Sequence, residues 1–187
     1  MIGKMRIIAG KAKGTKLYTL EGDNTRPTLD RVKESLFNII QDRLQDICFL
    51  DLFSGSGAIG LEALSRGAKK AILCDKSKEA YQIIQKNACK THLSESAEIY
   101  RMDFQNLLRN EIQEKIDIIF LDPPYQSDYA IKAVDMIFEK ELLQKDGMII
   151  IETDDQDKMI KQLESRKYDI KDIRKYGRAY LIFLKGI

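Results

Sequence analysis

A glycine-rich loop is the first part of the sequence that could do chemistry. Residues 55–60 read GSGAIG and separate an apolar segment, Ile47–Phe53, from a helical pattern. Small residues in such a loop let a ligand approach the backbone, and the helix N-terminus adds partial positive charge. Asp75 lies twenty residues after Gly55, at the end of the next expected strand, where a carboxylate can hold ribose hydroxyls. The spacing predicts a nucleotide-containing cofactor, with a nicotinamide or flavin dinucleotide as one possibility and a purely structural glycine turn as another.

Asp51 makes a dinucleotide cofactor less suitable. It lies inside the expected strand, four residues before Gly55, where dinucleotide-binding folds normally carry an apolar side chain. A carboxylate beside the loop suits a cationic group, such as the ammonium of a methionine moiety, and is a poor neighbour for a pyrophosphate. The segment from Asp51 to Gly57 resembles the cofactor loop of class I S-adenosylmethionine-dependent methyltransferases.

This resemblance implies S-adenosylmethionine as the cofactor. Asp103 follows the third expected strand, where that family usually places an acid that meets the adenine. Asp103 could equally cap a helix that begins at Phe104, and the two roles can coexist. The cofactor-binding residues that the resemblance implies are Asp51, Phe53, Gly55, Ser56, Gly57, Gly60, Asp75, Lys76, Asp103 and Phe104.

A second motif, Asp122–Tyr125, directly follows the apolar segment Ile116–Leu121. Aspartate and proline favour turns, so a turn that ends the strand is the simplest interpretation. The position is also the carboxyl end of an expected parallel strand, where open α/β sheets bind ligands. The tetrapeptide resembles the D-P-P-Y motif of methyltransferases that act on exocyclic amines of nucleobases. The resemblance implies catalytic roles for Asp122, Pro123, Pro124 and Tyr125.

The chemistry of such an amine explains these residue types. Its lone pair is delocalised into the ring, so acceptors on its two N–H bonds are needed to favour the pyramidal, nucleophilic form. Positive charge develops on the nitrogen in the transition state, and a fixed carboxylate at Asp122 would stabilise that charge. The carbonyl of Pro123 would be the second acceptor. Tyr125 would stack on the base, which contributes about 1–3 kcal/mol.

The elements that must position these motifs alternate between strand and helix. Near-continuous apolar strands in such an order predict an α/β fold with a doubly wound, mostly parallel, seven-stranded sheet and a C-terminal antiparallel hairpin. The expected strands of this sheet are Ile47–Phe53, Lys70–Cys74, Ala97–Arg101, Ile116–Leu121, Met148–Glu152, Tyr168–Tyr176 and Ala179–Leu184. The expected helices begin near Thr28, Ser77, Phe104, Tyr129 and Gln156, and a further helix follows the glycine-rich loop through Leu61 and Leu64.

The basic residues are concentrated at the start of the chain. Residues 1–33 carry a formal charge of +5, whereas the remainder carries −3. Short expected strands at Met5–Ile8 and Lys16–Leu20 indicate a small β-hairpin appendage over 1–25, ahead of a methyltransferase domain over 26–187. Such a segment is typical of a polyanion-binding extension, with a merely solvated basic end as the alternative. Lys11, Lys13 and Lys16 would bind phosphates.

With both motifs placed, nearly the whole chain resembles the bacterial 16S ribosomal RNA guanine-N2 methyltransferase family (RsmD-type). MRIIAG at Met5–Gly10 and the segment Thr25–Asn38 also match this family, while Lys175–Arg178 matches more loosely. The resemblance implies methyl transfer to N2 of one guanine, guanine 966, in 16S RNA of the small subunit or its precursor. It also implies RNA contacts by Arg26, Thr28, Arg31, Lys175 and Arg178. A helix start with solvated arginines and a plain hairpin tip are the alternatives for these positions.

Composition excludes several other classes of protein. With 187 residues, 44% hydrophobic residues and a net charge of +2, the chain is neither disordered nor in need of a metal to fold. Three cysteines without a CxxC pair exclude a zinc ribbon and a disulfide framework. No apolar run is long enough for a membrane span, so we expect a cytoplasmic monomer that binds neither membrane nor metal.

Three other functions remain open at this point. D-P-P-Y also occurs in DNA adenine-N6 methyltransferases, although these usually add a separate target-recognition region. A non-catalytic RNA-binding assembly factor could retain a similar pocket. An NAD-dependent oxidoreductase is a more distant alternative because of Asp51.

Overall fold

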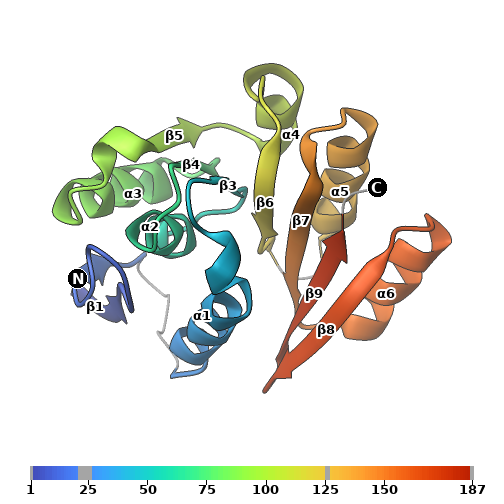
Figure 1. The fold of residues 1–187 in the computed structure, drawn as a ribbon, viewed down its shortest axis with the longest axis horizontal. Helices are drawn as coiled ribbons and strands as arrows, with labels where there is room; N and C mark the ends of the chain where they lie inside the picture. The colour runs from blue at the N-terminus through green and yellow to red at the C-terminus, as the bar shows by residue number, and fades with distance from the viewer. Residues whose placement is uncertain (1, 21–26, 125–126, 186–187) are drawn as a thin grey trace.

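The computed structural model describes residues 2–20, 27–124 and 127–185 (Figure 1). Its strands are β1 (Ile2–Arg6), β2 (Lys16–Tyr18), β3 (Cys48–Asp51), β4 (Lys70–Asp75), β5 (Ala97–Arg101), β6 (Ile116–Leu121), β7 (Leu143–Thr153), β8 (Ile170–Tyr176) and β9 (Ala179–Lys185). Its α-helices are α1 (Pro27–Ile40), α2 (Ala58–Ser65), α3 (Lys78–Lys90), α4 (Phe104–Asn106), α5 (Tyr129–Glu139) and α6 (Gln156–Ser165). None of the helices within these ranges is long and apolar enough to cross a bilayer.

Seven strands form one sheet in the order β5-β4-β3-β6-β7-β9-β8. The strands β3 to β7 pair in parallel, while β9 lies antiparallel between β7 and β8. This arrangement confirms the predicted doubly wound sheet and its C-terminal hairpin. The chain turns from β3 to β4 on one side and places β6 on the other. The carboxyl ends of β3 and β6 therefore flank a topological switch point, where open α/β sheets bind ligands.

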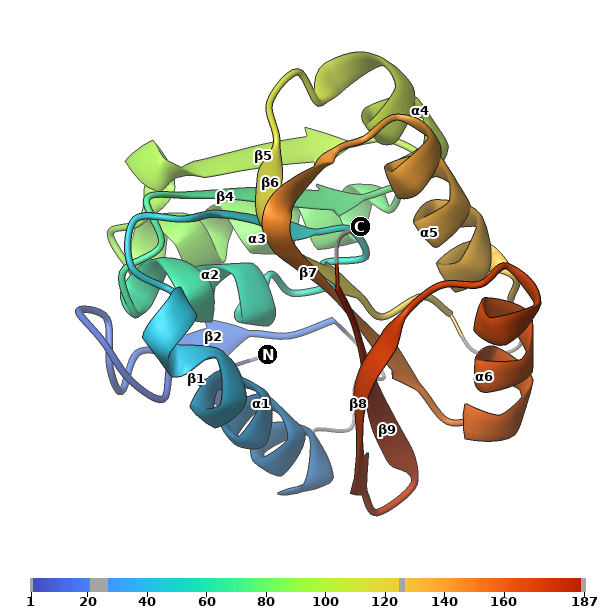
Figure 2. The same cartoon turned by 45° about the vertical axis from the view of Figure 1, so that its right-hand side comes forward.

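The central strands bury side chains on both faces, as their apolar sequences require. Phe49 and Phe120 pack into a core with α1, α2 and α3. Their neighbours Leu50 and Leu121 pack into a second core with α4, α5 and α6. Figure 2 shows the two groups of helices on opposite faces of the sheet. Both cores hold the strand ends that face the switch point in place.

β1 and β2 form a separate antiparallel pair, which confirms the predicted N-terminal hairpin. The predicted bounds of its first strand, Met5–Ile8, are wrong at both ends. The N–H groups of Ile8 and Ala9 donate instead to the Glu62 carboxylate, at 2.7 and 2.9 Å, so they leave the strand. The second strand ends at Tyr18, before the predicted Leu20.

This hairpin is fixed to helix α2. Glu62 on α2 is fully buried, and Lys33 and Arg66 lie 3.5 and 2.7 Å from its oxygens. Gly10 has φ of +81°, and a Cβ there would lie 1.8 Å from the carbonyl oxygen of Ser65. Only glycine allows this close approach. The hairpin is therefore packed on the body, and the division at residue 25 stays a prediction.

β3 is shorter than the predicted Ile47–Phe53, and β8 begins at Ile170 rather than at the predicted Tyr168. Two further elements differ more from the sequence pattern. β7 begins at Leu143, which pairs with Ile116 of β6, whereas the predicted start was Met148. The register shifts between these positions, so that Met148 pairs with Ile118. The helix predicted from Phe104 is α-helical only to Asn106 and continues as a π-helical turn over Leu107–Glu111. Neither difference changes the ends of the strands that carry the two motifs.

Candidate active site

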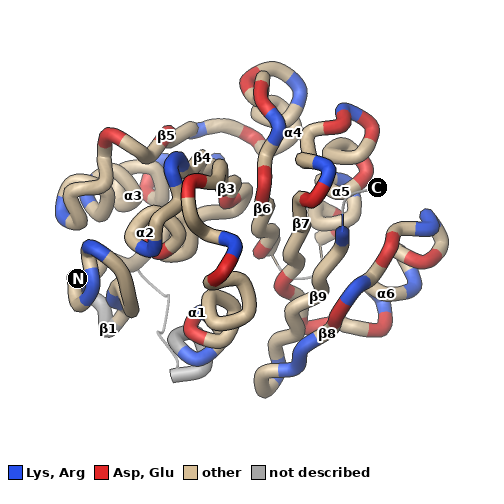
Figure 3. Tube along the Cα trace, in the orientation of Figure 1, with Lys and Arg blue, Asp and Glu red and all other residues tan. Residues whose placement is uncertain are grey.

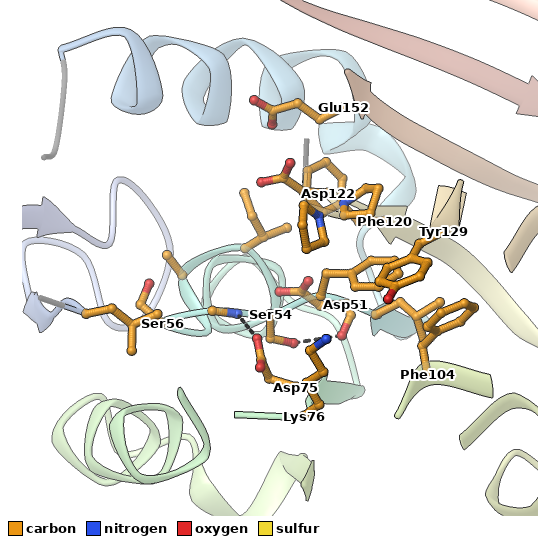
Figure 4. Close-up of a pocket in the computed structure, with 18 of the residues that line it drawn as sticks. Asp51, Ser54, Ser56, Asp75, Lys76, Phe104, Phe120, Asp122, Tyr129 and Glu152 are labelled. Carbon is orange, nitrogen blue, oxygen red and sulfur yellow. Dashed lines mark hydrogen bonds between the residues drawn. The ribbon is translucent and has the colours of Figure 1, made fainter. Parts of the chain in front are cut away.

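A cavity of about 410 Å³ opens at the carboxyl ends of β3, β4, β6 and β7, at the switch point of the sheet (Figure 4). The structure brings eleven of the predicted site residues to its wall. They are Asp51, Phe53, Gly55, Ser56, Asp75, Lys76, Asp103, Phe104, Asp122, Pro123 and Pro124. The two sequence motifs therefore meet at one site. Tyr125 lies outside the described residues.

Gly57 and Gly60 do not line the cavity and support the loop from behind. Gly57 has φ of 78° and immediately precedes α2, a conformation that favours glycine. A Cβ at Gly60 would lie 2.8 Å from Cδ2 of Leu73, so glycine lets α2 pack closely on β4. The N–H of Gly60 donates to Oδ2 of Asp51 at 3.2 Å. Both glycines position the loop and the carboxylate of Asp51.

Asp51 is a buried acid with like charges around it. Its side chain is 1% exposed at the end of β3. Burial raises the pKa of Asp51 to about 7; the hydrogen bond from Gly60 opposes this rise, while the negative charges of Asp122 and Asp75 add to it. A cation bound in the cavity would stabilise the ionised form of Asp51.

The raised pKa of Asp51 predicts a pH-dependent gain in stability for the Asp51→Asn variant. An acid whose pKa is raised by folding lowers stability as pH rises from about 4, its unfolded pKa, through about 7. Asparagine keeps an oxygen for the Gly60 N–H and has no charge to bury. We expect the variant to gain up to about 4 kcal/mol on the wild type between pH 4 and pH 8.

Urea unfolding of both ligand-free proteins across this pH range measures the gain. The Glu164→Gln variant, with an exposed acid on α6 replaced, is the matched control. A difference between the Asp51→Asn variant and the wild type that stays constant with pH would contradict the assigned burial.

Two other predicted acids organise the loops around the cavity. Asp75 accepts the N–H of Gly55 at 3.0 Å and the N–H of Ser77 at 2.8 Å, so it ties the glycine loop to the end of β4. Asp103 accepts the N–H of Gln105 at 2.9 Å and caps α4, which confirms the capping role considered for it. A role toward an adenine stays a prediction.

Three aromatic rings form one wall of the cavity. Phe53 and Phe104 lie 5.2 Å apart between centroids, and Tyr129 lies 6.3 and 5.3 Å from them. The ammonium of Lys76 lies 5.7 Å from the centroid of Tyr129. The sequence predicts Tyr129 only as the start of a helix. Its place in the site is not evident from the sequence, because it lies far along the chain from the glycine loop.

A second acid beside Asp122 was missed by the sequence analysis. Leu121 pairs with Ile151, so Asp122 and Glu152 follow a matched pair on neighbouring parallel strands. Figure 4 shows the carboxylates of both residues in the same part of the cavity. Burial, followed by the charge of Asp122, raises the pKa of Glu152 to about 8. An acid at the end of an apolar strand was the signal that identified Asp122, and Glu152 carries it too.

The predicted RNA-binding cations lie away from the cavity wall. The side chains of Lys11, Lys13, Lys16, Arg31, Lys175 and Arg178 are all exposed. Figures 1 and 3 place the N-terminal hairpin, α1 and the β8–β9 turn along one edge of the molecule. Arg26 lies outside the described residues, and Thr28 lies in α1, without a described side chain. The structure thus brings three of the predicted basic segments to a common edge.

Comparisons with known proteins agree with this architecture. The family described as conserved hypothetical protein 95 matches residues 5–185. A Bacillus subtilis protein provisionally named rRNA methyltransferase YlbH is 40% identical over 152 residues, which cover 80% of this chain and 83% of that protein. Ribosomal RNA small subunit methyltransferase D of Haemophilus influenzae is 37% identical over 156 residues, covering 81% and 80%. The solved structure of Escherichia coli yhhF, provisionally named a methyltransferase, has a TM-score of 0.81 at 27% identity and covers 98% of each chain.

Proposed function

Because the chain belongs to the conserved hypothetical protein 95 family, with the class I methyltransferase fold, we propose that it methylates N2 of a guanine in 16S ribosomal RNA. The methyl donor in this proposal is S-adenosylmethionine. The substrate is the small ribosomal subunit or its precursor, and guanine 966 is the expected position. The names of its relatives support an RNA substrate, and the cavity supports the chemistry.

The residues around the cavity fit S-adenosylmethionine. Asp75 lies close enough to Asp51 for its charge to raise the pKa of Asp51, so this part of the site favours a cationic ligand over a pyrophosphate. Asp51 would face the ammonium group, Asp75 the ribose hydroxyls and Asp103 the adenine. Phe53 and Phe104 would pack beside the nucleoside. When bound, this cofactor supplies a methyl group activated by the sulfonium.

Asp122 and Pro123 would prepare the target amine. The Asp122 carboxylate accepts one N–H of the amine, and the Pro123 carbonyl accepts the other. Both acceptors favour the pyramidal amine, and the carboxylate stabilises the positive charge that develops on nitrogen. The exposure of Asp122 at the end of β6 leaves it accessible to a nucleobase that enters from outside. The target base must leave any stack or pair, at a cost of a few kcal/mol, so an unpaired guanine is favoured.

The observation that carries this proposal is the meeting of Asp51 and Asp122 in one cavity, on the strands that flank the switch point. The test uses the full chain, S-adenosylmethionine with a labelled methyl group, and small-subunit particles from cells that lack this protein. Duplex DNA with unmethylated adenines is the second substrate. We expect label in the particles alone, mapped to guanine N2.

Each alternative function has its own outcome in this test. Label in the DNA at adenine N6 would identify a DNA methyltransferase. RNA binding without methyl transfer would identify a non-catalytic assembly factor. Calorimetry distinguishes the cofactors, because we expect heat of binding with S-adenosylmethionine and none with NAD.

The exposed lysines of the N-terminal hairpin predict a salt-dependent contribution to RNA affinity. Replacing Lys11, Lys13 and Lys16 together by glutamine should weaken RNA binding, because each lysine that neutralises a phosphate releases counterions. We expect the slope of log K against log salt to become shallower by about 0.7–0.9 for each phosphate that is no longer neutralised. Filter binding at several salt concentrations measures the slope.

A control variant with the same charge change separates local from general effects. Lys158, Lys161 and Lys167 are exposed in or just after α6, on another part of the molecule (Figure 1). Their replacement by glutamine should leave the slope nearly unchanged. Equal slopes for the two triple variants would remove the hairpin lysines from the RNA interface.

A further inference from the structure

Glu152 is the acid in the cavity that has no role in the proposed methyl transfer. It follows Ile151 on β7, directly beside the strand end that carries Asp122. Neighbouring strands lie about 4.8 Å apart, so two side chains at matched positions can reach neighbouring atoms of one ligand. Glu152 is paired with Leu181 of β9 in the sheet register, and Lys33 of α1 lines the same cavity. Glu152 therefore lines the cavity beside the position at which a nucleobase would meet Asp122.

The hydrogen-bonding edge of guanine matches such a pair of acids. In guanine, the N2 amine lies next to N1–H, so the two neighbouring groups are both donors. In adenine, the N6 amine lies next to an unprotonated N1, which is an acceptor. An ionised carboxylate only accepts hydrogen bonds, so it pairs with N1–H and repels a bare N1. Enzymes that act on an extruded base read this edge by hydrogen bonds.

We propose that Glu152 accepts the N1–H of the target guanine while Asp122 holds the adjacent N2 amine. The pair then selects guanine over purines whose N1 is an acceptor. This inference rests on the proposed function and adds the group that determines the base. Glu152 contacts the base at N1–H, while Asp122 and Pro123 bind the amine that receives the methyl group.

The electrostatics of the pair support this assignment. Burial, followed by the repulsion from Asp122, raises the pKa of Glu152 to about 8, so the ligand-free acid is largely protonated at neutral pH. An N–H donor placed against Glu152 favours its ionised form, and N1–H of guanine would be such a donor. Two adjacent N–H donors would relieve that repulsion, because one of them would approach each carboxylate. A base with a donor beside an acceptor would relieve it at Asp122 alone.

The Glu152→Gln variant tests the proposal through substrate preference. Glutamine has nearly the same shape and offers an N–H donor as well as an oxygen acceptor. 2-Aminopurine carries its amine at the same carbon as guanine but has an unprotonated N1, so it suits glutamine. Small-subunit RNA is prepared by ligation with either guanine or 2-aminopurine at the mapped target position and assembled into particles. The readout is kcat/KM for each particle with each enzyme.

We expect the wild type to prefer guanine and the variant to lose much of that preference. The ratio of kcat/KM for guanine to that for 2-aminopurine should fall by about 10–100-fold, the effect of one mismatched base contact. Comparing ratios between two enzymes cancels the difference in reactivity between the two amines. The Glu164→Gln variant on α6 should keep the wild-type ratio, and calorimetry should give unchanged cofactor affinity for both variants.

Two results would overturn the proposal while the proposed function stands. One is a Glu152→Gln variant with wild-type activity on both substrates, and the other is an equal loss on both substrates, since either result leaves the ratio unchanged. If the wild type fails to methylate guanine in the particles, the proposed function itself fails, and the assignment of Glu152 fails with it. Thermal melting confirms that the variant is folded, and Glu152→Ala, which removes both the acceptor and the charge, should lower activity on guanine without improving activity on 2-aminopurine.

Discussion

The Asp122→Ala variant is expected to lose about 10²–10⁴-fold in turnover while its affinity for S-adenosylmethionine barely changes. A positioned group that acts only in the transition state contributes to kcat and little to ground-state binding. Asp122 fits this description because it lies at the end of β6, exposed toward the space where a base would enter. Single-turnover methyl transfer and calorimetry measure the two quantities separately.

Two further variants sharpen this result. Asp122→Asn keeps an oxygen acceptor and removes the charge, so its turnover should lie between those of the wild type and the alanine variant. Asp146→Ala removes an exposed acid elsewhere on β7 and should leave turnover unchanged. Full activity of the Asp122→Ala variant, or a loss that appears only in cofactor affinity, would refute the catalytic role.

The second large effect is expected on stability, from Glu62→Ala. Glu62 is fully buried and accepts two backbone N–H groups of the N-terminal hairpin, besides pairing with Lys33 and Arg66. Removing one partner of a buried ion pair leaves the other charge poorly compensated, at a cost of about 3–5 kcal/mol. Urea unfolding should show this loss in the free energy of unfolding.

Matched variants separate the charge from the loss of packing. Glu79→Ala, at an exposed position on α3, should cost far less. Adding Lys33→Met to Glu62→Ala removes the more buried of the two charges left behind, since Lys33 is 4% exposed, and should recover part of the stability. If the double variant is less stable than Glu62→Ala alone, the charge is not the cause.

The fold was predictable where local sequence and burial agree. The strands at Lys70 and Ile116 are largely apolar runs that the sheet buries on both faces, and the structure starts both at the predicted residue. The hairpin of the N-terminal segment was also predictable, but its bounds were not. The N–H groups of Ile8 and Ala9 are taken by Glu62, more than fifty residues later in the chain.

The site was predictable where one motif carries the chemistry in consecutive residues. The glycine loop and the residues after β6 are such motifs, and both reach the cavity. Glu152 was missed because its neighbour Asp122 lies thirty residues away, and only the register of β6 and β7 brings them together. Tyr129 was missed for a similar reason, since its ring meets Phe53 from the loop after β3 and Phe104 from the start of α4.

The attachment of the N-terminal hairpin to α2 limits the modularity of this protein. The same short helix carries Glu62, which holds the hairpin, and Gly60, which holds Asp51. A truncation at the start of the α/β body would deprive Glu62 of two donors and uncover the packing of Ile7 and Leu17. Transferring this hairpin to a related enzyme would likewise require transferring α2 and the glycine loop. The hairpin and α2 can therefore be exchanged only together.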